Sequence, residues 1–216
     1  MDINSDKLVT TTWLAENLED PNIRIIEIGR DERGDTYSEG HIPNAVFWFW
    51  KDKLWHNSDR EFASPVEIAK YLGEIGMTER SKIVLYGDPI QYGTYGLWVL
   101  TMAGFNNVYL LDGGRTTWIA EGRCLSKIIP QFEPYEVISS GANLSTRIGR
   151  DDVLKNLKDS KRVLVDARSP EEYEGERVSP PGAFDHGAER EGRIPGAQHL
   201  FFRDLLNYTC LTIFLT

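Results

Sequence analysis

Short apolar runs alternate with amphipathic segments along the chain, and this alternation predicts the order of its strands and helices. Residues 8–18 carry apolar side chains at helical spacing and predict the first helix. The nearly continuous apolar run 23–28 predicts a buried strand, and a turn at 39–46 enters another short strand. Strands that alternate with helices at these lengths indicate a parallel sheet with helices on both faces. The predicted fold class is therefore α/β.

The most complete helix signal begins at Ser64. Ser64 is a good N-cap residue, Pro65 suits the first helical position, and Glu67 completes a capping box. Apolar residues then recur at helical spacing as far as Gly76, which predicts the end of this helix.

Residues 82–104 predict a strand, a loop and a helix in succession. The apolar positions of the expected helix are Leu97, Trp98, Leu100, Thr101 and Met102. In an open parallel sheet, ligands bind beyond the carboxyl ends of the strands, where such a loop meets a helix N-terminus. The loop, residues 87–93, contains Gly87, Asp88 and Gly93 but no Cys, Ser or His. It therefore offers no evident nucleophile.

The chain is expected to hold two domains. A strand at 107–112 and a loop with a short helix at 113–120 complete the first, which we place at residues 1–127. Two prolines and weak periodicity mark 128–144 as a linker. The second domain, 145–216, begins with a predicted helix and strand of its own.

The start of the second domain repeats the first. Leu157 follows Leu18, and Asp166 follows Glu27, at the same offset of 139 residues. The segment 192–197 repeats 40–45 at an offset of 152, so the second copy carries 13 additional residues between Arg168 and Glu191. The same offset would place the counterpart of the loop 87–93 after residue 216, so we expect the second copy to be incomplete.

Composition and charge narrow the class of function. The chain has 216 residues, of which 41% are hydrophobic, as in a globular protein. A net charge of -9 gives no basic surface for nucleic acid or for anionic lipid. No apolar run approaches the length of a spanning helix, so we expect no membrane partner and a cytoplasmic location.

Metal and cofactor chemistry finds little support in the sequence. Cys124 and Cys210 have no paired ligand spacing, and each is expected to be a small buried hydrophobe or a bystander thiol. Asp185, His186 and Glu189 could bind a metal, but a solvated loop is the simpler interpretation. We predict neither a metal nor a cofactor.

Several motifs together resemble the two-domain rhodaneses, the thiosulfate sulfurtransferases. They are Gly-His-Ile-Pro-Asn-Ala (40–45), Val-Leu-Tyr-Gly-Asp (84–88), Leu-Leu-Asp-Gly-Gly-Arg-x-x-Trp (110–118), Val-Asp-Ala-Arg-Ser-Pro-Glu-Glu-Tyr (165–173) and Gly-Arg-Ile-Pro-Gly-Ala (192–197). The resemblance implies tandem rhodanese-like domains, of which the first lacks the nucleophile and the second carries it. In that family a cysteine takes the outer sulfur of thiosulfate as a persulfide and passes it to cyanide or another thiophilic acceptor. Asp88 agrees with a non-catalytic first domain, because a carboxylate repels an anionic donor.

The resemblance also assigns candidate residues to the second domain. Asp166 and Arg168 match the acid and the arginine at the end of its first strand, where they would orient the active loop and attract the anionic donor. The alternative is a strand-end salt bridge that holds the insertion. Glu172 stands where some relatives place a basic contact. The family's cysteine would lie beyond Thr216, so no catalytic residue is assigned and the chain is expected to be inactive alone.

Two further functions were considered. A non-catalytic rhodanese-like module would bind a partner or a small anion, and self-association through an unpaired sheet edge would stabilise its second half. A phosphatase-like use of the loop fails because residues 87–93 lack the Cys and Arg that it requires. Trp48, Trp50 and Trp55 are expected to form a core or interface patch rather than a stacking platform.

Overall fold

A computed structural model describes residues 6–56, 61–179, 188, 190–207 and 212–213 of the chain. The chain divides into two compact units, with the boundary between Thr146 and Arg147. The first unit contains a five-stranded sheet in the order β1-β5-β4-β2-β3, and every pair of neighbouring strands is parallel. The strands are β1 (Leu8–Val9), β2 (Ile23–Gly29), β3 (Ala45–Phe49), β4 (Lys82–Asp88) and β5 (Val108–Leu111).

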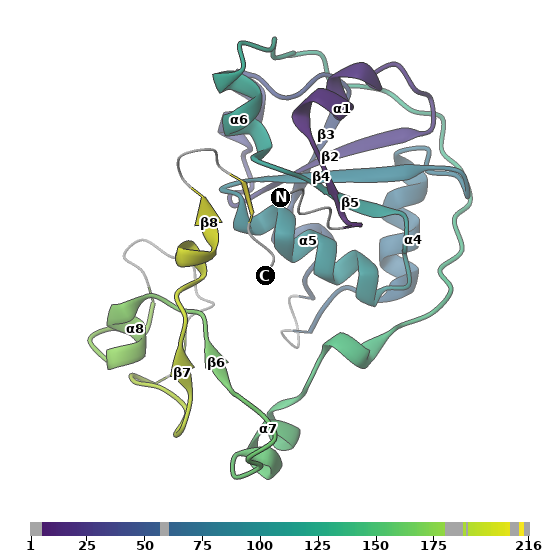
Figure 1. Ribbon diagram of the computed structural model, residues 1–216. Helices are drawn as coiled ribbons and strands as arrows, with labels where there is room; N and C mark the ends of the chain where they lie inside the picture. Colours follow the sequence, from purple (N-terminus) through teal and green to yellow (C-terminus); the bar gives the residue numbers. More distant parts are fainter. Residues whose placement is uncertain (1–5, 57–60, 180–187, 189, 208–211, 214–216) are drawn as a thin grey trace. The chain divides into compact units, whose positions relative to one another are not determined.

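Helices cover both faces of this sheet. Figure 1 shows α1 (Thr11–Glu16) and α6 (Gly114–Ala120) on one face, and α4 (Pro65–Glu74) and α5 (Gln91–Met102) on the other. The short helix α2 (Asp35–Glu39) precedes β3, and α3 (Trp50–Lys53) packs beside α4. The predicted α/β class, a parallel sheet with helices on both faces, is confirmed.

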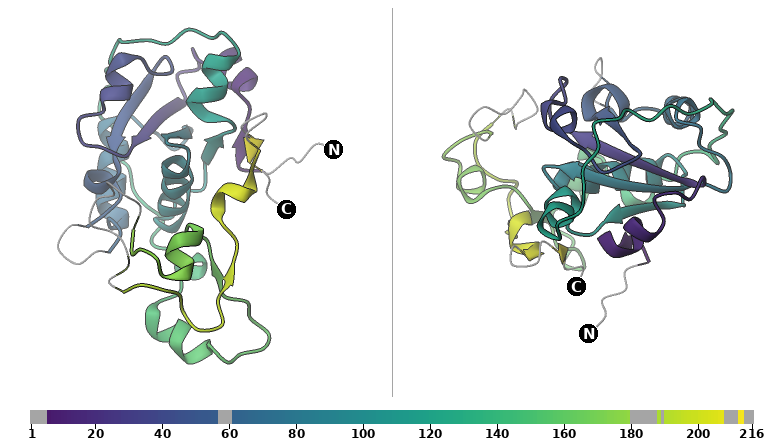
Figure 2. Two further views of the ribbon diagram at one scale, coloured as in Figure 1. Left: turned by 90° about the vertical axis from the view of Figure 1, so that its left-hand side faces the viewer. Right: turned by 90° about the horizontal axis from the view of Figure 1, so that it is seen from above.

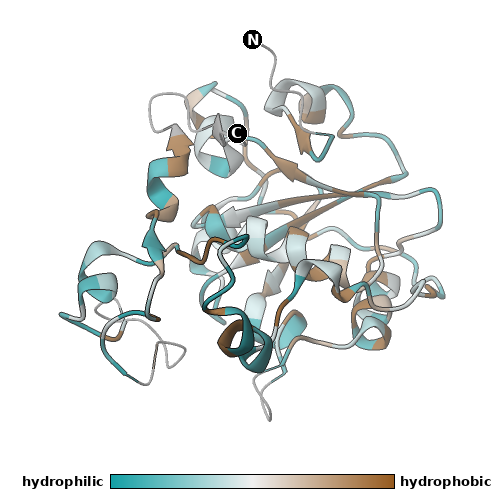
Figure 3. Cartoon of the chain, turned by 60° about the horizontal axis from the view of Figure 1, so that its bottom comes forward, coloured by the Kyte–Doolittle hydropathy of each residue, from teal (hydrophilic) through white to brown (hydrophobic). Residues whose placement is uncertain are grey.

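The two central strands contribute to the core on both faces. Alternate residues of β2 point to opposite sides, so Ile25 packs with Leu14 and Trp118 beneath α1 and α6, while Ile28 faces Gly96 of α5. Figure 3 shows these strands coloured as predominantly hydrophobic. A strand that is buried on both faces explains why 23–28 reads as a continuous apolar run.

The helix predicted from Ser64 forms as expected. The Ser64 hydroxyl accepts a hydrogen bond from the Glu67 N–H at 3.3 Å, and the Ser64 N–H donates to the Glu67 carboxylate at 2.8 Å. Gly76 follows the helix with a φ of 66°, a left-handed conformation that glycine adopts at little cost. Local side-chain chemistry is sufficient to define both ends of α4.

The segment 8–18 differs from its prediction. Leu8 and Val9 form β1, whose partners in β5 are Leu110 and Leu111, and the helix begins only at Thr11. The Thr10 side chain caps this helix by accepting from the Trp13 N–H at 3.0 Å. A two-residue strand is too short to show periodicity, so only its pairing with a distant strand identifies it.

The buried face of α5 also differs from the predicted apolar stripe. The residues of α5 that are buried are Gly93, Gly96, Val99, Leu100 and Met102. Trp98 is instead exposed, and its indole N–H donates to the Thr146 hydroxyl at 3.2 Å. Glycines bring the helix close to the sheet, and a count of apolar side chains does not detect them.

The segment 128–144 runs along the first unit before the short 3-10 helix η1 (Leu144–Thr146), as Figure 2 shows. The Tyr135 N–H donates to the Gly73 carbonyl at 3.0 Å, and the Ser139 hydroxyl donates to the Ala103 carbonyl at 2.5 Å. This segment therefore packs against the ends of α4 and α5 rather than hanging free.

The second unit contains a smaller set of elements. They are α7 (Arg150–Asn156), β6 (Val165–Asp166), α8 (Pro170–Glu174), β7 (Gln198–His199), the 3-10 helix η2 (Phe202–Leu205) and β8 (Leu206–Asn207). The last strand described, β9 (Thr212–Ile213), is divided between the units, with Thr212 in the first and Ile213 in the second. β6 and β7 pair in parallel. The strand predicted at 162–167 is thus only two residues long, because among the described residues β6 has a neighbour on one side only.

The strand register of the first unit recurs in the second. Glu27 lies opposite Phe47, and Asp166 lies opposite His199, each residue shifted by the offset found in the sequence. The Tyr37 hydroxyl donates to the Ala45 carbonyl at 2.8 Å, and the Tyr173 hydroxyl donates to the Ala197 carbonyl at the same distance. The two offsets therefore describe equivalent three-dimensional positions.

Candidate functional site

Asp166 and Arg168 meet at the carboxyl end of β6. The Arg168 guanidinium donates from Nε to Asp166 Oδ1 at 2.9 Å and from Nη2 to Oδ2 at 2.7 Å, a two-pronged contact. The Arg168 backbone N–H also donates to Asp166 Oδ1, at 3.1 Å. The hydrogen bond from Arg168 is the main cause that lowers the pKa of Asp166 below its usual value. The carboxylate is therefore ionised and fixed at neutral pH.

Arg168 also contacts the inserted segment. Its Nη2 donates to the Gly192 carbonyl at 2.8 Å, so one guanidinium joins the strand end to the far end of the insertion. The Arg168 side chain is still 30% exposed, whereas that of Asp166 is 11% exposed. The pair thus has the geometry of a strand-end clamp and leaves part of a cation accessible to solvent.

The helix that follows this strand end, α8, is capped at its N-terminus by its own residue Glu172. Ser169 and Glu172 form a capping box, in which the Ser169 hydroxyl donates to Glu172 Oε2 at 2.7 Å. Glu172 is buried, so its carboxylate serves the start of α8 instead of facing an anionic ligand. The resemblance did not assign a role to Glu172, and in the structure its carboxylate caps the start of α8.

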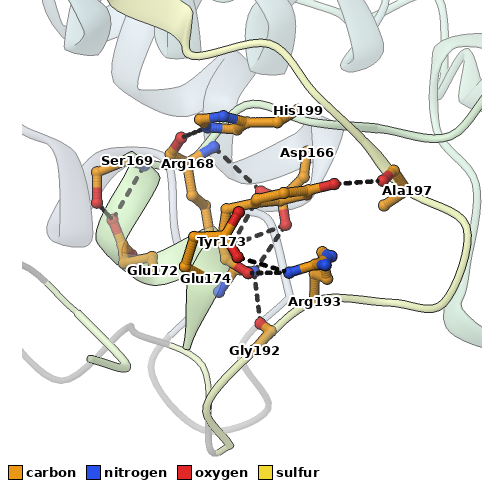
Figure 4. A network of polar contacts seen from close by, with 10 residues as sticks. All are labelled: Asp166, Arg168, Ser169, Glu172, Tyr173, Glu174, Gly192, Arg193, Ala197 and His199. Atoms are coloured by element: carbon orange, nitrogen blue, oxygen red, sulfur yellow. Dashed lines mark hydrogen bonds and ion pairs between the residues drawn. The ribbon is translucent and has the colours of Figure 1, made fainter. Parts of the chain in front are cut away.

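Two aromatic rings and one arginine complete the network, as Figure 4 shows. The Tyr173 ring stacks on the His199 ring with centroids 4.5 Å apart, and the Arg193 guanidinium lies 4.4 Å from the centroid of Tyr173. His199 Nε2 lies 2.8 Å from the Arg168 carbonyl oxygen. Neither Tyr173 nor His199 was predicted to be a site residue, although the offset of 152 residues places His199 at the position of Phe47.

The loop candidates of the first unit lie at the junction of β4 and α5, but the connection is shorter than the predicted loop 87–93. Gly87 and Asp88 are the last residues of β4, Gly93 lies in the first turn of α5, and only residues 89–90 connect the two elements. The backbones of Gly87 and Gly93 are in such close contact that a Cβ on Gly87 would overlap the Gly93 nitrogen. The N–H groups of Tyr92 and Gly93 donate to the carbonyls of Pro89 and Ile90 at 3.1 Å each. These two N–H groups are therefore used within the segment itself.

A buried acid lies beside that loop, at the end of β2. Glu27 is 1% exposed and accepts a hydrogen bond of 2.5 Å from the Tyr86 hydroxyl. Burial, together with the nearby charge of Asp88, raises the pKa of Glu27 to about 7, although the Tyr86 hydrogen bond opposes the shift. The sequence showed Glu27 only as the counterpart of Asp166. Gly29 stands where the second unit has Arg168, and the positive charge that acts on Glu27, lowering its pKa, is that of Arg115 on α6.

The turn motif 40–45 of the first unit has a structural role. His41 Nδ1 lies 3.0 Å from the Tyr37 carbonyl and Nε2 lies 3.1 Å from the Ile128 carbonyl, while the ring stacks on Tyr37. Arg193 occupies the equivalent place in the second unit and lies 3.2 Å from both the Tyr173 carbonyl and the Glu174 carboxylate. Through these contacts both residues stabilise the turn.

The thiols and the inserted polar residues give no reactive centre among the described residues. Cys124 is exposed beyond the end of α6, and its carbonyl accepts from the Trp118 indole N–H at 2.9 Å. Cys210, Asp185, His186 and Glu189 lie outside the described residues. Within the described ranges, no group of three or more His, Cys, Asp or Glu side chains is placed to hold a metal ion. None of the helices described is both long and apolar enough to cross a bilayer.

The fold and the site define a class: an α/β protein with a parallel sheet whose strand register recurs in a second unit, with an acid–arginine pair at the recurring strand end. The family model described as "Rhodanese-like domain" matches residues 10–121 and 150–211. The chain belongs to the rhodanese-like family of sulfurtransferases.

Named relatives support this membership. The "Sulfur carrier protein TtuD" of Thermus thermophilus is 38% identical over 204 residues, which cover 93% of this chain and 71% of the relative. A "Putative thiosulfate sulfurtransferase" of Haloferax volcanii is 34% identical over 212 residues, covering 95% and 73% of the two chains. The crystal structure of SseA from Escherichia coli, a 3-mercaptopyruvate sulfotransferase, is similar in fold, with a TM-score of 0.74 and 24% identity over 93% of this chain and 76% of that one.

Proposed function

We propose that the protein takes part in sulfur transfer from thiosulfate. In this reaction a cysteine thiolate attacks the outer sulfur of thiosulfate, the sulfur–sulfur bond of the donor breaks, and sulfite leaves with its electron pair. The resulting cysteine persulfide is then attacked at its outer sulfur by cyanide or another thiophilic acceptor. Thiocyanate leaves when the acceptor is cyanide, and the thiolate is regenerated.

The observation that carries the proposal is the fixed cation at the end of β6. Thiosulfate is a dianion, and Arg168 presents a partly exposed guanidinium beyond the carboxyl end of a parallel strand, where α/β proteins bind ligands. Its partner Asp166 holds the guanidinium in one orientation. We assign Arg168 to donor attraction and Asp166 to the orientation of Arg168.

The nucleophile is not assigned to any described residue. The loop 87–93 contains no cysteine, and Cys124 is exposed in the first unit, beyond α6. We therefore expect the 216-residue chain to bind thiosulfate without producing thiocyanate from thiosulfate and cyanide.

Titration calorimetry with sodium thiosulfate tests this function. Arg168→Gln removes the guanidinium charge and should weaken thiosulfate binding roughly tenfold, the effect of losing a charge-assisted hydrogen bond. The control, Arg150→Gln, removes an arginine whose side chain is 93% exposed on α7 and should leave the affinity unchanged. Equal affinities for the two variants would contradict the role assigned to Arg168. Thiocyanate production by the unmodified chain would instead contradict the expectation that it lacks the nucleophile.

A binding or regulatory module is the second candidate function. Two observations favour it. The N–H groups of Tyr92 and Gly93 are hydrogen-bonded within the segment 87–93, and one edge of β6 has no strand partner among the described residues. Such an edge offers backbone N–H and C=O groups to another chain, including a second copy of this one. Sedimentation velocity distinguishes the candidates, because self-association would make the sedimentation coefficient rise with concentration.

A further inference from the structure

We infer that His199 is a positioning residue for Arg168 and that it keeps the guanidinium available to the anionic donor. The inference rests on the proposed function, because it concerns the same arginine. It adds a residue that lies on β7, outside the acid–arginine pair.

The contact from His199 is directed at the backbone of Arg168. His199 Nε2 lies 2.8 Å from the Arg168 carbonyl oxygen, and a carbonyl can only accept, so Nε2 carries the proton. The imidazole is held in place on its face by the Tyr173 ring, at an interplanar angle of 16°. Tyr173 is itself fixed by its hydroxyl, which donates to the Ala197 carbonyl at 2.8 Å. The donor is therefore preorganised before any ligand arrives.

In the first unit, the position equivalent to His199 holds a side chain that cannot donate a hydrogen bond. Phe47 stands at the position of His199, and Gly29 stands at the position of Arg168. A Cβ on Gly29 would overlap the Phe47 ring. With Phe on the neighbouring strand, a side chain at position 29 would therefore require the Phe47 ring to move. With the smaller imidazole of His199, the strand end of the second unit accommodates an arginine and also provides a hydrogen bond to its carbonyl.

Anchoring this carbonyl limits where the side chain of Arg168 can go. The backbone N–H of Arg168 is bound to Asp166 and its C=O to His199, so both peptide groups that flank its Cα are fixed. The guanidinium then reaches Asp166 and Gly192 from a defined starting point. Loss of the anchor would let the guanidinium move away from the strand end while the salt bridge partner stays in place.

Four variants of the 216-residue chain test the inference: His199→Phe, His199→Gln, Arg168→Gly and the double variant Arg168→Gly with His199→Phe. Gln retains a side-chain N–H donor at a similar reach, whereas Phe keeps a ring but loses the donor and adds bulk. The readouts are the Arg168 Nε–H signal in proton–nitrogen NMR, thiosulfate affinity by calorimetry, and the urea midpoint.

His199→Phe should shift or broaden the Arg168 Nε–H signal, lower thiosulfate affinity about tenfold and lower the urea midpoint. His199→Gln should retain the signal and stay within about twofold of the unmodified affinity. Adding Arg168→Gly to His199→Phe should raise the midpoint above that of His199→Phe alone, because the clash is removed. An unchanged Arg168 signal in His199→Phe would overturn the inference, and so would equal losses in the Phe and Gln variants.

The outcomes separate this inference from the proposed function. If the unmodified chain does not bind thiosulfate, the proposed function fails. The Arg168 NMR signal and the urea midpoints then still decide whether His199 positions Arg168, because neither measurement requires thiosulfate.

Discussion

Glu27 differs from its counterpart Asp166 in its partner rather than in its place in the fold. Asp166 is paired with an arginine, which lowers its pKa, whereas Glu27 has a phenol, and its burial raises its pKa to about 7. Two carboxylates at equivalent strand ends therefore have opposite shifts. The second unit gains an ionised, oriented acid, and the first unit keeps an acid that titrates near neutral pH.

The pKa of Glu27 predicts a pH-dependent stability for the first unit. Between pH 4.5, its ordinary value, and about 7, the folded form holds the proton more tightly than the unfolded form. The free energy of unfolding should therefore fall as pH rises through this window, by an amount on the order of 3 kcal/mol at most. Glu27→Gln should remove this loss, so its advantage over the unmodified chain should grow between pH 5 and pH 8 in urea denaturation. Glu16→Gln, at an exposed position on α1, is the control, and parallel curves for Glu27→Gln and the unmodified chain would contradict the prediction.

Among the individual site residues, those that belong to sequence motifs could be predicted. Asp166 and Arg168 follow from Val-Asp-Ala-Arg, and the structure pairs them. Tyr173 and His199 could not be assigned in the same way, because their contacts join α8 to β7 across the insertion. The burial of Glu27 depends on how α6 and the turn at Ile42 close over the strand end, which no local pattern records.

The junction of β4 and α5 is tightly packed around two glycines. Gly87 and Gly93 bring two backbone segments into contact, and a Cβ at either position would meet main-chain atoms. We predict that Gly87→Ala lowers the free energy of unfolding by roughly 2 kcal/mol or more, because the backbone must shift to accept a methyl group. Gly149→Ala is the matched control, since a Cβ there meets nothing within 4 Å. Chemical denaturation of both variants measures the difference, and similar midpoints would contradict it.

Elements were predicted well where local chemistry defines them. α4 has its cap, its first proline and its final glycine in sequence order, and all three positions are as expected. β1 was missed because its two residues gain their structure from β5, about a hundred residues later. In α5 the predicted positions Leu100 and Met102 are buried, but Trp98 is exposed. The buried Gly93 and Gly96 were missed because they carry no apolar side chain.

The two units differ in how much apolar surface they bury. Among the described residues of the second unit, Ala197 is the only hydrophobic side chain that is buried. The large hydrophobic residues exposed there are Ile148, Leu154, Val163, Val165, Ile194, Leu200 and Leu205. A groove of about 410 Å³ with Val153, Leu157 and Val163 in its lining lies between α7 and the segments 162–164 and 195–198. The second unit as described therefore has much less of a core to stabilise it.

Limited proteolysis with trypsin should cut the second unit first. Lys70 on α4 and Lys155 on α7 are both exposed helical lysines, so they differ chiefly in the stability of the unit that carries them. We expect cleavage after Lys155 at least tenfold faster than after Lys70, as measured by mass spectrometry over time. Equal rates would show that the second unit is stabilised by something other than its own buried surface.

The repeated organisation of the chain could be predicted from two sequence offsets. The offsets of 139 and 152 residues predicted a repeat with an insertion, and the strand registers of both units agree with these offsets. The extent of each unit was less accessible from sequence. Residues 128–144 read as a linker because they lack periodicity, but hydrogen bonds to Gly73 and Ala103 attach them to the first unit.

The overlap between Gly29 and Phe47 has a consequence for substitutions at these two positions. An arginine introduced alone at position 29 would collide with the phenylalanine, and a histidine introduced alone at position 47 would leave a gap beside a glycine. The arrangement of the second unit thus requires two changes in the first, and we expect either change alone to lower the stability of the first unit. The two positions are therefore coupled, since neither substitution is tolerated well without the other.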